Sequence, residues 1–357
     1  MLVTVRSFAK INLGLCIGPR RPDGFHDLRT VYQTIGLHDI LRLRVVRGSG
    51  IEIRSTDPRV PTDNSNTCYR MLERAMSALA ATGRIVLEIE KKLPVQGGLG
   101  GASGNAVSAL LALEIALKKR LPDAERLRIA TDIGSDVPLF LIGGTVLGVG
   151  RGEDVYPLPD LPSTHCVIAT PEIGVSTPKA FADWDALRAS PENPADAGPN
   201  IVGGATGVPA RQQPEAAPKL TRPDHSDRML RFSREVSAWL SSVSFGKSKG
   251  RLSGVPARGR GRAEILLLDL VRTGIENDFE QVVFPQYPVL RDVKCAVEKA
   301  GAAYASLSGS GSAIYGVFGT KAAADRAVVR LKKQGIPALA TVTLTRSQYW
   351  KKFRVST

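Results

Sequence analysis

The chain of 357 residues contains few of the residues that bind metals or form disulfides. Its four cysteines are far apart, form no CxxC pair, and have no histidine at metal-ligand spacing (Cys16, Cys68, Cys166 and Cys295). We therefore expect reduced, mostly buried thiols rather than a structural zinc site or a disulfide framework.

Long hydrophobic runs are also missing. No stretch approaches the roughly 18 uninterrupted apolar residues that a membrane span needs. The opening MLVTVRSFAKINLGL alternates polar and apolar residues instead of forming a signal-peptide core. Hydrophobic residues nevertheless make up 43% of the chain, which is enough to form two globular domains. We expect a folded, two-domain, cytoplasmic protein with no membrane partner.

The formal charge of +14 raises the question of a nucleic-acid partner, because clustered Lys and Arg bind phosphate. Between residues 185 and 262 the chain has 13 Lys and Arg against 7 Asp and Glu, and it is rich in Pro, Gly and Ala. This composition is poor material for a core, so we predict a flexible insertion at about 190–260. Within it, residues 228–243 show the apolar spacing of one short helix.

The same segment has few aromatic residues that could stack on bases, and we therefore expect no nucleic-acid partner. The alternative hypothesis is a binding protein in which this basic segment contacts an acidic partner and the rest of the chain is an inactive scaffold.

A lysine and an aspartate in two separate segments are candidates for phosphoryl-transfer chemistry. In FAKINLGLCI, residues 8–17, apolar residues alternate as in a strand with one buried face, so Lys10 and Asn12 share the other face. Lys10 is either a surface lysine or a catalytic cation, and Asp136, in GSDVPLFL, is either a helix cap or a catalytic carboxylate. An aspartate can take or orient the proton of an acceptor hydroxyl while a lysine stabilises the transferring charge.

Two glycine-rich turns suit phosphate. KKLPVQGGLGGASGNAVSALLAL, residues 91–113, joins a strand pattern to a helix pattern. Its glycines let backbone N–H groups approach an anion at a helix N-terminus, and Ser103 is available as a cap or phosphate donor. YASLSGSGSAIYGVFG, residues 304–319, contains a second such turn. Taken singly, a purely structural turn and a tight hairpin explain these segments equally well.

Together and in this order, AKINLGL, PVQGGLGGASGNA and SLSGSGSAIYG resemble the three motifs of the GHMP small-molecule kinases. RRPDGFHDLRTVYQTI, GSDVPLFLIGGTVLGVGRGE and NDFEQVVFPQYP further resemble one family among them, the 4-diphosphocytidyl-2-C-methyl-D-erythritol kinases. The resemblance implies an α+β fold of two domains, an ATP-binding domain at 1–165 and a C-terminal domain at 166–357, with the active site in the cleft between them. It also implies ATP-dependent phosphorylation of the erythritol 2-hydroxyl in the non-mevalonate route to isoprenoid precursors, with Mg²⁺ accompanying ATP.

The resemblance assigns roles to individual residues. Lys10 and Asp136 would be catalytic, and Asn12 would position the substrate. Phe25 would stack on cytosine, and His26 would hydrogen-bond its edge. The ATP phosphates would lie against Pro94, Gly97, Gly98, Leu99, Gly100, Gly101 and Ser103, and the substrate would be supported by Gly309, Ser310 and Gly311. The metal ligands are not predicted.

Four residues depart from the usual pattern of the family: Phe8 replaces proline, Phe25 replaces tyrosine, Gln96 replaces a small residue and Gly104 replaces serine. Phe25 keeps the stacking plane. We expect Gln96 to crowd the entry of the glycine loop and Gly104 to remove a phosphate donor, and both changes should weaken ATP binding. A kinase for homoserine or mevalonate is the nearest alternative, but such substrates have no base for the DGFH segment to read.

Overall fold

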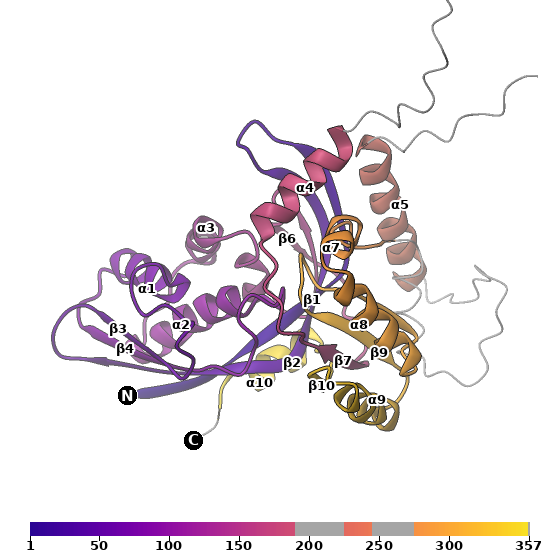
Figure 1. Cartoon of the computed structure of the whole chain (residues 1–357). Coiled ribbons are helices and arrows are strands. Elements are labelled where there is room, and N and C mark those ends of the chain that lie inside the picture. Colours follow the sequence, from indigo (N-terminus) through magenta and orange to yellow (C-terminus); the bar gives the residue numbers. More distant parts are fainter. Residues whose placement is uncertain (190–224, 245–274, 356–357) are drawn as a thin grey trace, which may run out of the picture.

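The computed structural model describes residues 1–189, 225–244 and 275–355. Two sheets form its framework (Figure 1). One is six-stranded, with the order β3-β4-β2-β5-β6 and β1 paired to β2. The other has four antiparallel strands in the order β10-β7-β9-β8. The α+β class expected from the sequence is confirmed.

The elements have the following bounds. The strands are β1 (Leu2–Arg20), β2 (His26–Val46), β3 (Ile51–Ser55), β4 (Arg84–Glu90), β5 (Thr145–Val149), β6 (Asp154–Pro157), β7 (His165–Ala169), β8 (Tyr304–Leu307), β9 (Ile314–Phe318) and β10 (Ala338–Val342). The helices are α1 (Thr67–Ala78), α2 (Gly101–Leu117), α3 (Asp123–Ile133), the 3₁₀ helix η1 (Pro138–Leu141), α4 (Thr177–Ala189), α5 (His225–Ser244), α7 (Glu280–Gln286), α8 (Pro288–Lys299), α9 (Lys321–Lys333) and α10 (Arg346–Phe353).

The long antiparallel pair of β1 and β2 crosses the molecule and connects its two halves (Figure 1). The pairing register of the two strands shifts between Phe8 and Ala9. The apolar residues of β1 before and after this shift belong to two different hydrophobic cores. Val5 lies in the core beneath α1 and α2, whereas Ile11 lies in a core shared with β9. The strand predicted over residues 8–17 is confirmed.

Helix α2 is enclosed by its neighbours, and every residue from 104 to 114 is buried. Its apolar side chains, among them Val107 and Leu110, pack with Leu41 and Leu87 of the first sheet. A helix that is apolar on all sides is stable only when it is covered on all sides. The N-terminus of α2 is therefore held rigidly where the glycine-rich segment enters it.

The end of the chain returns to the first sheet. Tyr349 of α10 shares a small core with Phe8 and Leu344, and its hydroxyl donates to the carbonyl of Phe140 at 2.8 Å. The second sheet begins with β7, close to the boundary expected at residue 165. The division into 1–165 and 166–357 stays a prediction, and α10 lies on the first of these two parts.

Part of the predicted insertion is built into the fold. Residues 225–244 form α5, which confirms the helix expected at 228–243. Its buried side chains belong to the core next to β1 (Met229, Phe232, Val236 and Trp239). The average composition of the segment gave no sign that it joins a core. Four apolar residues on one helical face are nevertheless sufficient to anchor α5. The rest of the insertion, including its basic stretch at 247–262, lies outside the described residues.

Three of the four thiols are buried, namely those of Cys16, Cys68 and Cys166, while Cys295 is exposed. Burial raises the pKa of each buried thiol to about 12. The expectation of mostly buried thiols is thus confirmed. Within the described part of the chain, no helix is long and apolar enough to cross a membrane, and the cytoplasmic location stays a prediction.

Candidate active site

A cavity of about 710 Å³ collects most of the residues singled out from the sequence. Its volume falls in the range of sites for small molecules. The predicted residues that line it are Lys10, Asn12, Phe25, His26, Gly98, Gly100, Ser103, Asp136, Gly309 and Ser310. These residues come from the two long strands, the glycine loop and the turn after β8, which are far apart in sequence.

Lys10 and Asp136 form an ion pair in this cavity. The Lys10 ammonium lies 3.3 Å from Asp136 Oδ2 and donates a hydrogen bond of 2.7 Å to Asn12 Oδ1. Lys10 is only 2% exposed, so it is not the surface lysine that the strand pattern left open. Asp136 keeps 37% of its side chain exposed and makes no cap for the following 3₁₀ helix. The pair therefore offers a carboxylate whose charge is balanced by a fixed cation.

Asn12 is held in one orientation. Its side-chain amide donates to Thr30 Oγ1 at 2.8 Å, and the Thr30 hydroxyl in turn donates to the carbonyl of Gly14 at 2.7 Å. The amide N–H groups therefore face Thr30, and Asn12 Oδ1 is left to accept from Lys10. This chain of buried hydrogen bonds sets the position of the Lys10 ammonium.

Tyr32 is a third member of this group, beside Lys10 and Asp136, and the sequence analysis missed it. Its hydroxyl donates to Asp136 Oδ1 at 3.0 Å. Burial, and then the nearby Asp136 charge, raise the pKa of Tyr32 well above its usual value, so the phenol stays a donor. Tyr32 pairs with Asn12 across the β1–β2 ribbon. The sequence analysis placed Asn12 on a strand, but it did not give the strand pairing that brings Tyr32 beside it.

The glycine loop and the second glycine turn are joined across the two sheets. The Ser308 hydroxyl donates to the Gly98 carbonyl at 3.0 Å, and the Ala313 amide donates to that of Gly97 at 3.1 Å. Gly98 has a φ of 72°, and a Cβ there would lie 2.1 Å from the Ser308 carbonyl oxygen, so only glycine fits. Gly311 lies against Gly98 and is absent from the cavity lining, so it supports the loop rather than facing the cavity.

A buried carboxylate anchors both ends of the glycine loop. Asp39 is fully buried and accepts from the backbone amides of Lys92 and Leu93 at 2.7 and 2.8 Å, just before the loop. It also accepts from Asn105 Nδ2 at 3.0 Å, in the first turn of α2 after the loop, and from the Lys91 ammonium at 2.6 Å. No feature of the sequence distinguished Asp39 from an ordinary strand-surface aspartate.

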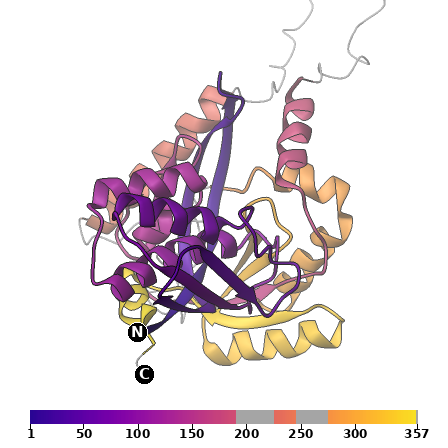
Figure 2. The same cartoon turned by 90° about the vertical axis from the view of Figure 1, so that its left-hand side faces the viewer.

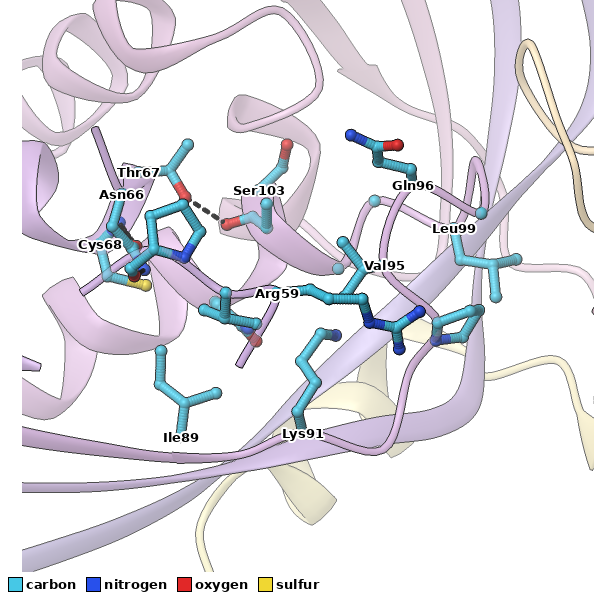
Figure 3. A pocket seen from close by; sticks show the side chains of 18 of the residues that line it. Arg59, Asn66, Thr67, Cys68, Ile89, Lys91, Val95, Gln96, Leu99 and Ser103 are labelled. Atoms are coloured by element: carbon cyan, nitrogen blue, oxygen red, sulfur yellow. Dashed lines mark hydrogen bonds between the residues drawn. The ribbon is translucent and has the colours of Figure 1, made fainter. Parts of the chain in front are cut away.

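A second cavity of about 360 Å³ adjoins the first and contains the remaining loop residues (Figure 3). It is lined by all seven residues predicted to hold ATP, namely Pro94, Gly97, Gly98, Leu99, Gly100, Gly101 and Ser103. Figure 3 shows Ser103 on the side of α2, with Lys91 and Arg59 reaching in from the other side. The two cavities share Gly98, Gly100 and Ser103. A donor bound in one would thus present its end to an acceptor in the other.

The far end of the larger cavity is aromatic. Phe25 is 51% exposed, and the guanidinium of Arg151 lies 5.0 Å from its ring centroid. His26 is buried, and its ring stacks on Phe181 of α4 at 4.9 Å, with 10° between the planes. His26 Nε2 is 2.7 Å from Asp185 Oδ1. The sequence analysis missed both Phe181 and Asp185, and it counted Asp185 only as the first residue of the Pro- and Gly-rich span at 185–262.

The comparisons with known proteins agree with this geometry. Residues 66–144 match the family of GHMP kinases N terminal domains, and residues 263–337 match that of GHMP kinases C terminal. The 4-diphosphocytidyl-2-C-methyl-D-erythritol kinase of Solibacter usitatus is 35% identical over 324 residues, which are 91% of this chain and 84% of that protein. The chain belongs to the 4-diphosphocytidyl-2-C-methyl-D-erythritol kinases.

Solved structures place this kinase in the same fold. The crystal structure of a 4-(cytidine 5'-diphospho)-2C-methyl-D-erythritol kinase superposes with a TM-score of 0.64 at 26% identity, covering 95% of this chain and 98% of that one. Homoserine kinase from Cytophaga hutchinsonii gives 0.63 at 20% identity, with 96% and 95% covered, which shows the fold alone. The predicted GHMP kinase fold and the assignment as a small-molecule kinase are confirmed.

Gly104 does not have the effect in this kinase that the sequence analysis expected. A Cβ at this position would lie 2.9 Å from the Phe8 carbonyl oxygen and 3.0 Å from Ser7 Oγ. Position 104 therefore faces β1, and Gly104 lines neither cavity. No phosphate donor is lost there, because a larger residue would meet the strand instead of the ligand. The expectation was wrong because the helical phase of residue 104 relative to β1 is not visible in the sequence.

Gln96 lies at the loop entry, and its backbone has a feature that the sequence did not reveal. It has a left-handed backbone with a φ of 60°, which is rare for a residue other than glycine. Its side-chain amide points toward Gly174, which follows β7 of the second sheet. A Cβ built on Gly174 would lie 3.6 Å from Gln96 Oε1. Gln96 is exposed and lines the second cavity, so its effect falls on the backbone as well as on the space at the loop entry.

Proposed function

We propose that this kinase transfers the γ-phosphoryl group of ATP to the 2-hydroxyl of 4-diphosphocytidyl-2-C-methyl-D-erythritol, in the non-mevalonate route to isoprenoid precursors. The observation that carries this proposal is a single cavity with the Lys10–Asp136 pair at one end and the aromatic group of Phe25 and His26 at the other. Such a cavity suits a substrate that has both an alcohol and a base. Homoserine and mevalonate have no base to occupy the aromatic end.

Asp136 would act on the acceptor hydroxyl. Its carboxylate is held by the Tyr32 phenol and the Lys10 ammonium, so one lone pair of each oxygen is engaged and others remain for the substrate. As the hydroxyl oxygen forms its bond to the γ-phosphorus and the bond to ADP breaks, the proton passes to Asp136. Lys10 balances the negative charge that spreads over the transferring phosphoryl group.

ATP would bind with its phosphates against the loop at 94–101 and the N-terminus of α2, where backbone N–H groups and the helix dipole favour an anion. In the described part of the chain, no three His, Cys, Asp or Glu side chains converge on one point. That suits Mg²⁺, which usually keeps several waters and binds through substrate phosphates and one or two protein oxygens. Ser103, at the wall that the two cavities share, and Asp136, in the larger cavity, would offer side-chain oxygens to the ion, and the bound ion would neutralise phosphate charge.

The cytosine base would lie at the aromatic end. Phe25 offers an exposed ring face, and Phe181 and His26 form a stacked pair opposite the catalytic end. Arg20 and Arg151 also line the cavity, which suits a substrate that has a diphosphate between base and alcohol. With these residues the kinase would discriminate against small alcohols, because it would recognise the nucleotide half of the proposed substrate.

An ADP-release assay with Mg²⁺-ATP tests the proposal. We expect turnover with 4-diphosphocytidyl-2-C-methyl-D-erythritol and background rates with homoserine or mevalonate. Asp136→Asn should lower kcat by at least about a hundredfold, because loss of a general base typically costs that much. Asp132→Asn is the matched control, since Asp132 lies exposed on α3 and pairs with Arg74 and Arg128. Equal turnover of homoserine would overturn the substrate assignment.

A further inference from the structure

Helix α4 fixes the His26 ring from two directions. Phe181 and Asp185 are four residues apart and therefore lie on one face of the helix. Phe181 stacks on the imidazole and sets its plane. Asp185 Oδ1 lies 2.7 Å from Nε2 and sets the rotation of the ring within that plane. A ring constrained in both ways presents its other nitrogen, Nδ1, in one direction only.

The hydrogen bond to Asp185 also decides where the imidazole carries its proton. An ionised carboxylate only accepts hydrogen bonds, so Nε2 must be the donor. In the neutral imidazole the proton is then on Nε2, and Nδ1 has a free lone pair. No hydrogen bond joins Nδ1 to another residue of the described chain. His26 is therefore prepared to accept a hydrogen bond through Nδ1.

We propose that Asp185 is a positioning residue for base specificity, because it holds His26 as an acceptor for the exocyclic amine of cytosine. In the same pose, uracil would place its O4 lone pairs against the Nδ1 lone pair, which leaves two acceptors facing each other. The inference rests on the proposed function, and it assigns to Asp185 a part of the preference for a cytidine over a uridine substrate.

The helix that carries Asp185 is itself held at its start and near its middle. Thr177, at its start, shares a hydrogen bond of 2.7 Å with Ser310 of the second glycine turn. Trp184, adjacent to Asp185, is buried with the Arg228 guanidinium of α5 4.9 Å from its ring centroid. Figure 2 shows α4 and α5 standing beside the end of the β1–β2 ribbon. The carboxylate is thus presented to His26 from a supported helix instead of a free loop.

The first test compares kcat/KM for the cytidine substrate and its uridine analogue in wild-type protein and Asp185→Asn. An amide can donate to Nε2 as well as accept from it, so both imidazole tautomers become available. We expect the cytidine preference to fall about tenfold, as for the loss of one specific hydrogen bond, with the KM for ATP unchanged. Asp183→Asn is the control, because Asp183 on the same helix pairs with Lys179. An unchanged preference in folded Asp185→Asn protein would overturn the inference.

A second measurement needs no variant of Asp185. The chain has four histidines, so ¹⁵N spectra of the imidazoles can be assigned by comparison with His26→Gln. With the imidazole neutral, we expect the His26 proton on Nε2 and a bare Nδ1. A proton on Nδ1 would contradict the inference whatever the kinetics show.

The two proposals fail in different ways. If wild-type protein does not turn over the cytidine substrate, the proposed function is wrong. If it does, and Asp185→Asn keeps the full preference for cytidine, only the role of Asp185 is wrong.

Discussion

The Tyr32 hydroxyl donates a hydrogen bond of 3.0 Å to Asp136, on the carboxylate oxygen that Lys10 does not contact. The carboxylate is therefore held on both sides, by a neutral donor and by a cation. Because burial and the nearby Asp136 charge raise the pKa of Tyr32 well above its usual value, the phenol keeps its proton near neutral pH and stays a donor. Tyr32 positions Asp136 without taking a proton itself.

Tyr32→Phe should lower kcat about tenfold, because a hydrogen bond to a charged group contributes about 1.5–3 kcal/mol and here fixes the direction of the carboxylate. The KM for ATP should change little, since Tyr32 does not line the second cavity, where we propose that ATP binds. Steady-state kinetics with both substrates varied would measure this. Tyr156→Phe is a suitable control, since that residue is 56% exposed. An unchanged kcat would show that Lys10 alone orients Asp136.

Asp39 and Lys91 form a buried pair at the base of the glycine loop. Asp39→Asn leaves the Lys91 ammonium almost enclosed without a counter-charge, which typically costs about 3–5 kcal/mol. We expect the free energy of unfolding to fall by that amount and the KM for ATP to rise. Adding Lys91→Met should recover part of the lost stability, because the unpaired charge is then removed. Urea unfolding of both variants would check this, and a double variant less stable than Asp39→Asn would contradict it.

The sequence predicted the individual motifs better than their assembly. Strand alternation placed Lys10 and Asn12 on one face, and the glycine pattern located the loop, because both depend on local periodicity and backbone freedom. Tyr32 and Asp39 escaped notice because their roles depend on strand register and on which chain segment crosses above them. Neither property is recorded in a short sequence window.

For helix α5 the local spacing was interpreted correctly as helical, but its place in a hydrophobic core was not predicted. Its segment looked unsuited to a core because the Pro, Gly and Arg content of its neighbours dominated the average composition. The four apolar side chains on one face decided the outcome, since burial depends on the pattern within a helix rather than on composition. Asp185 was counted with the Pro- and Gly-rich span at 185–262 for the same reason, although it lies within α4.

Gly104→Ser tests the corrected interpretation of the glycine loop. A serine Cβ would approach the Phe8 carbonyl oxygen to 2.9 Å, and its hydroxyl would need still more space. We expect the free energy of unfolding to fall by about 1–3 kcal/mol, as for overpacking of a buried contact. Affinity for ATP should not improve. Thermal unfolding and nucleotide titration would measure both, and tighter ATP binding at unchanged stability would restore the expectation drawn from the sequence.

Arg228 connects α5 to the substrate wall. Its guanidinium pairs with the buried Asp278 carboxylate and stacks on Trp184 of α4. Burial raises the pKa of Asp278, whereas Arg228 acts in the opposite direction. In Arg228→Ala the carboxylate loses its counter-charge while it still accepts from the Ile17 amide at 2.8 Å. The pKa of Asp278 should then rise further, because an unpaired buried charge favours protonation.

Arg228→Ala should therefore be destabilised by about 3–5 kcal/mol near neutral pH. A carboxyl whose pKa is raised in the folded state contributes stability below its unfolded pKa and loses it as the pH rises. The deficit relative to wild type should thus shrink as the pH falls and Asp278 takes up a proton, which happens at a higher pH than for an ordinary aspartate because burial raises its pKa. The KM for the cytidine substrate should rise while that for ATP stays constant, since α4 forms the wall of the substrate cavity alone. Arg231→Ala, at an exposed position on the same helix, is the control. If the two variants unfold alike at every pH, Arg228 supports neither Asp278 nor the substrate wall, and α5 is held by its apolar face and by Arg29, which donates to the Met229 carbonyl and to Ser233 Oγ.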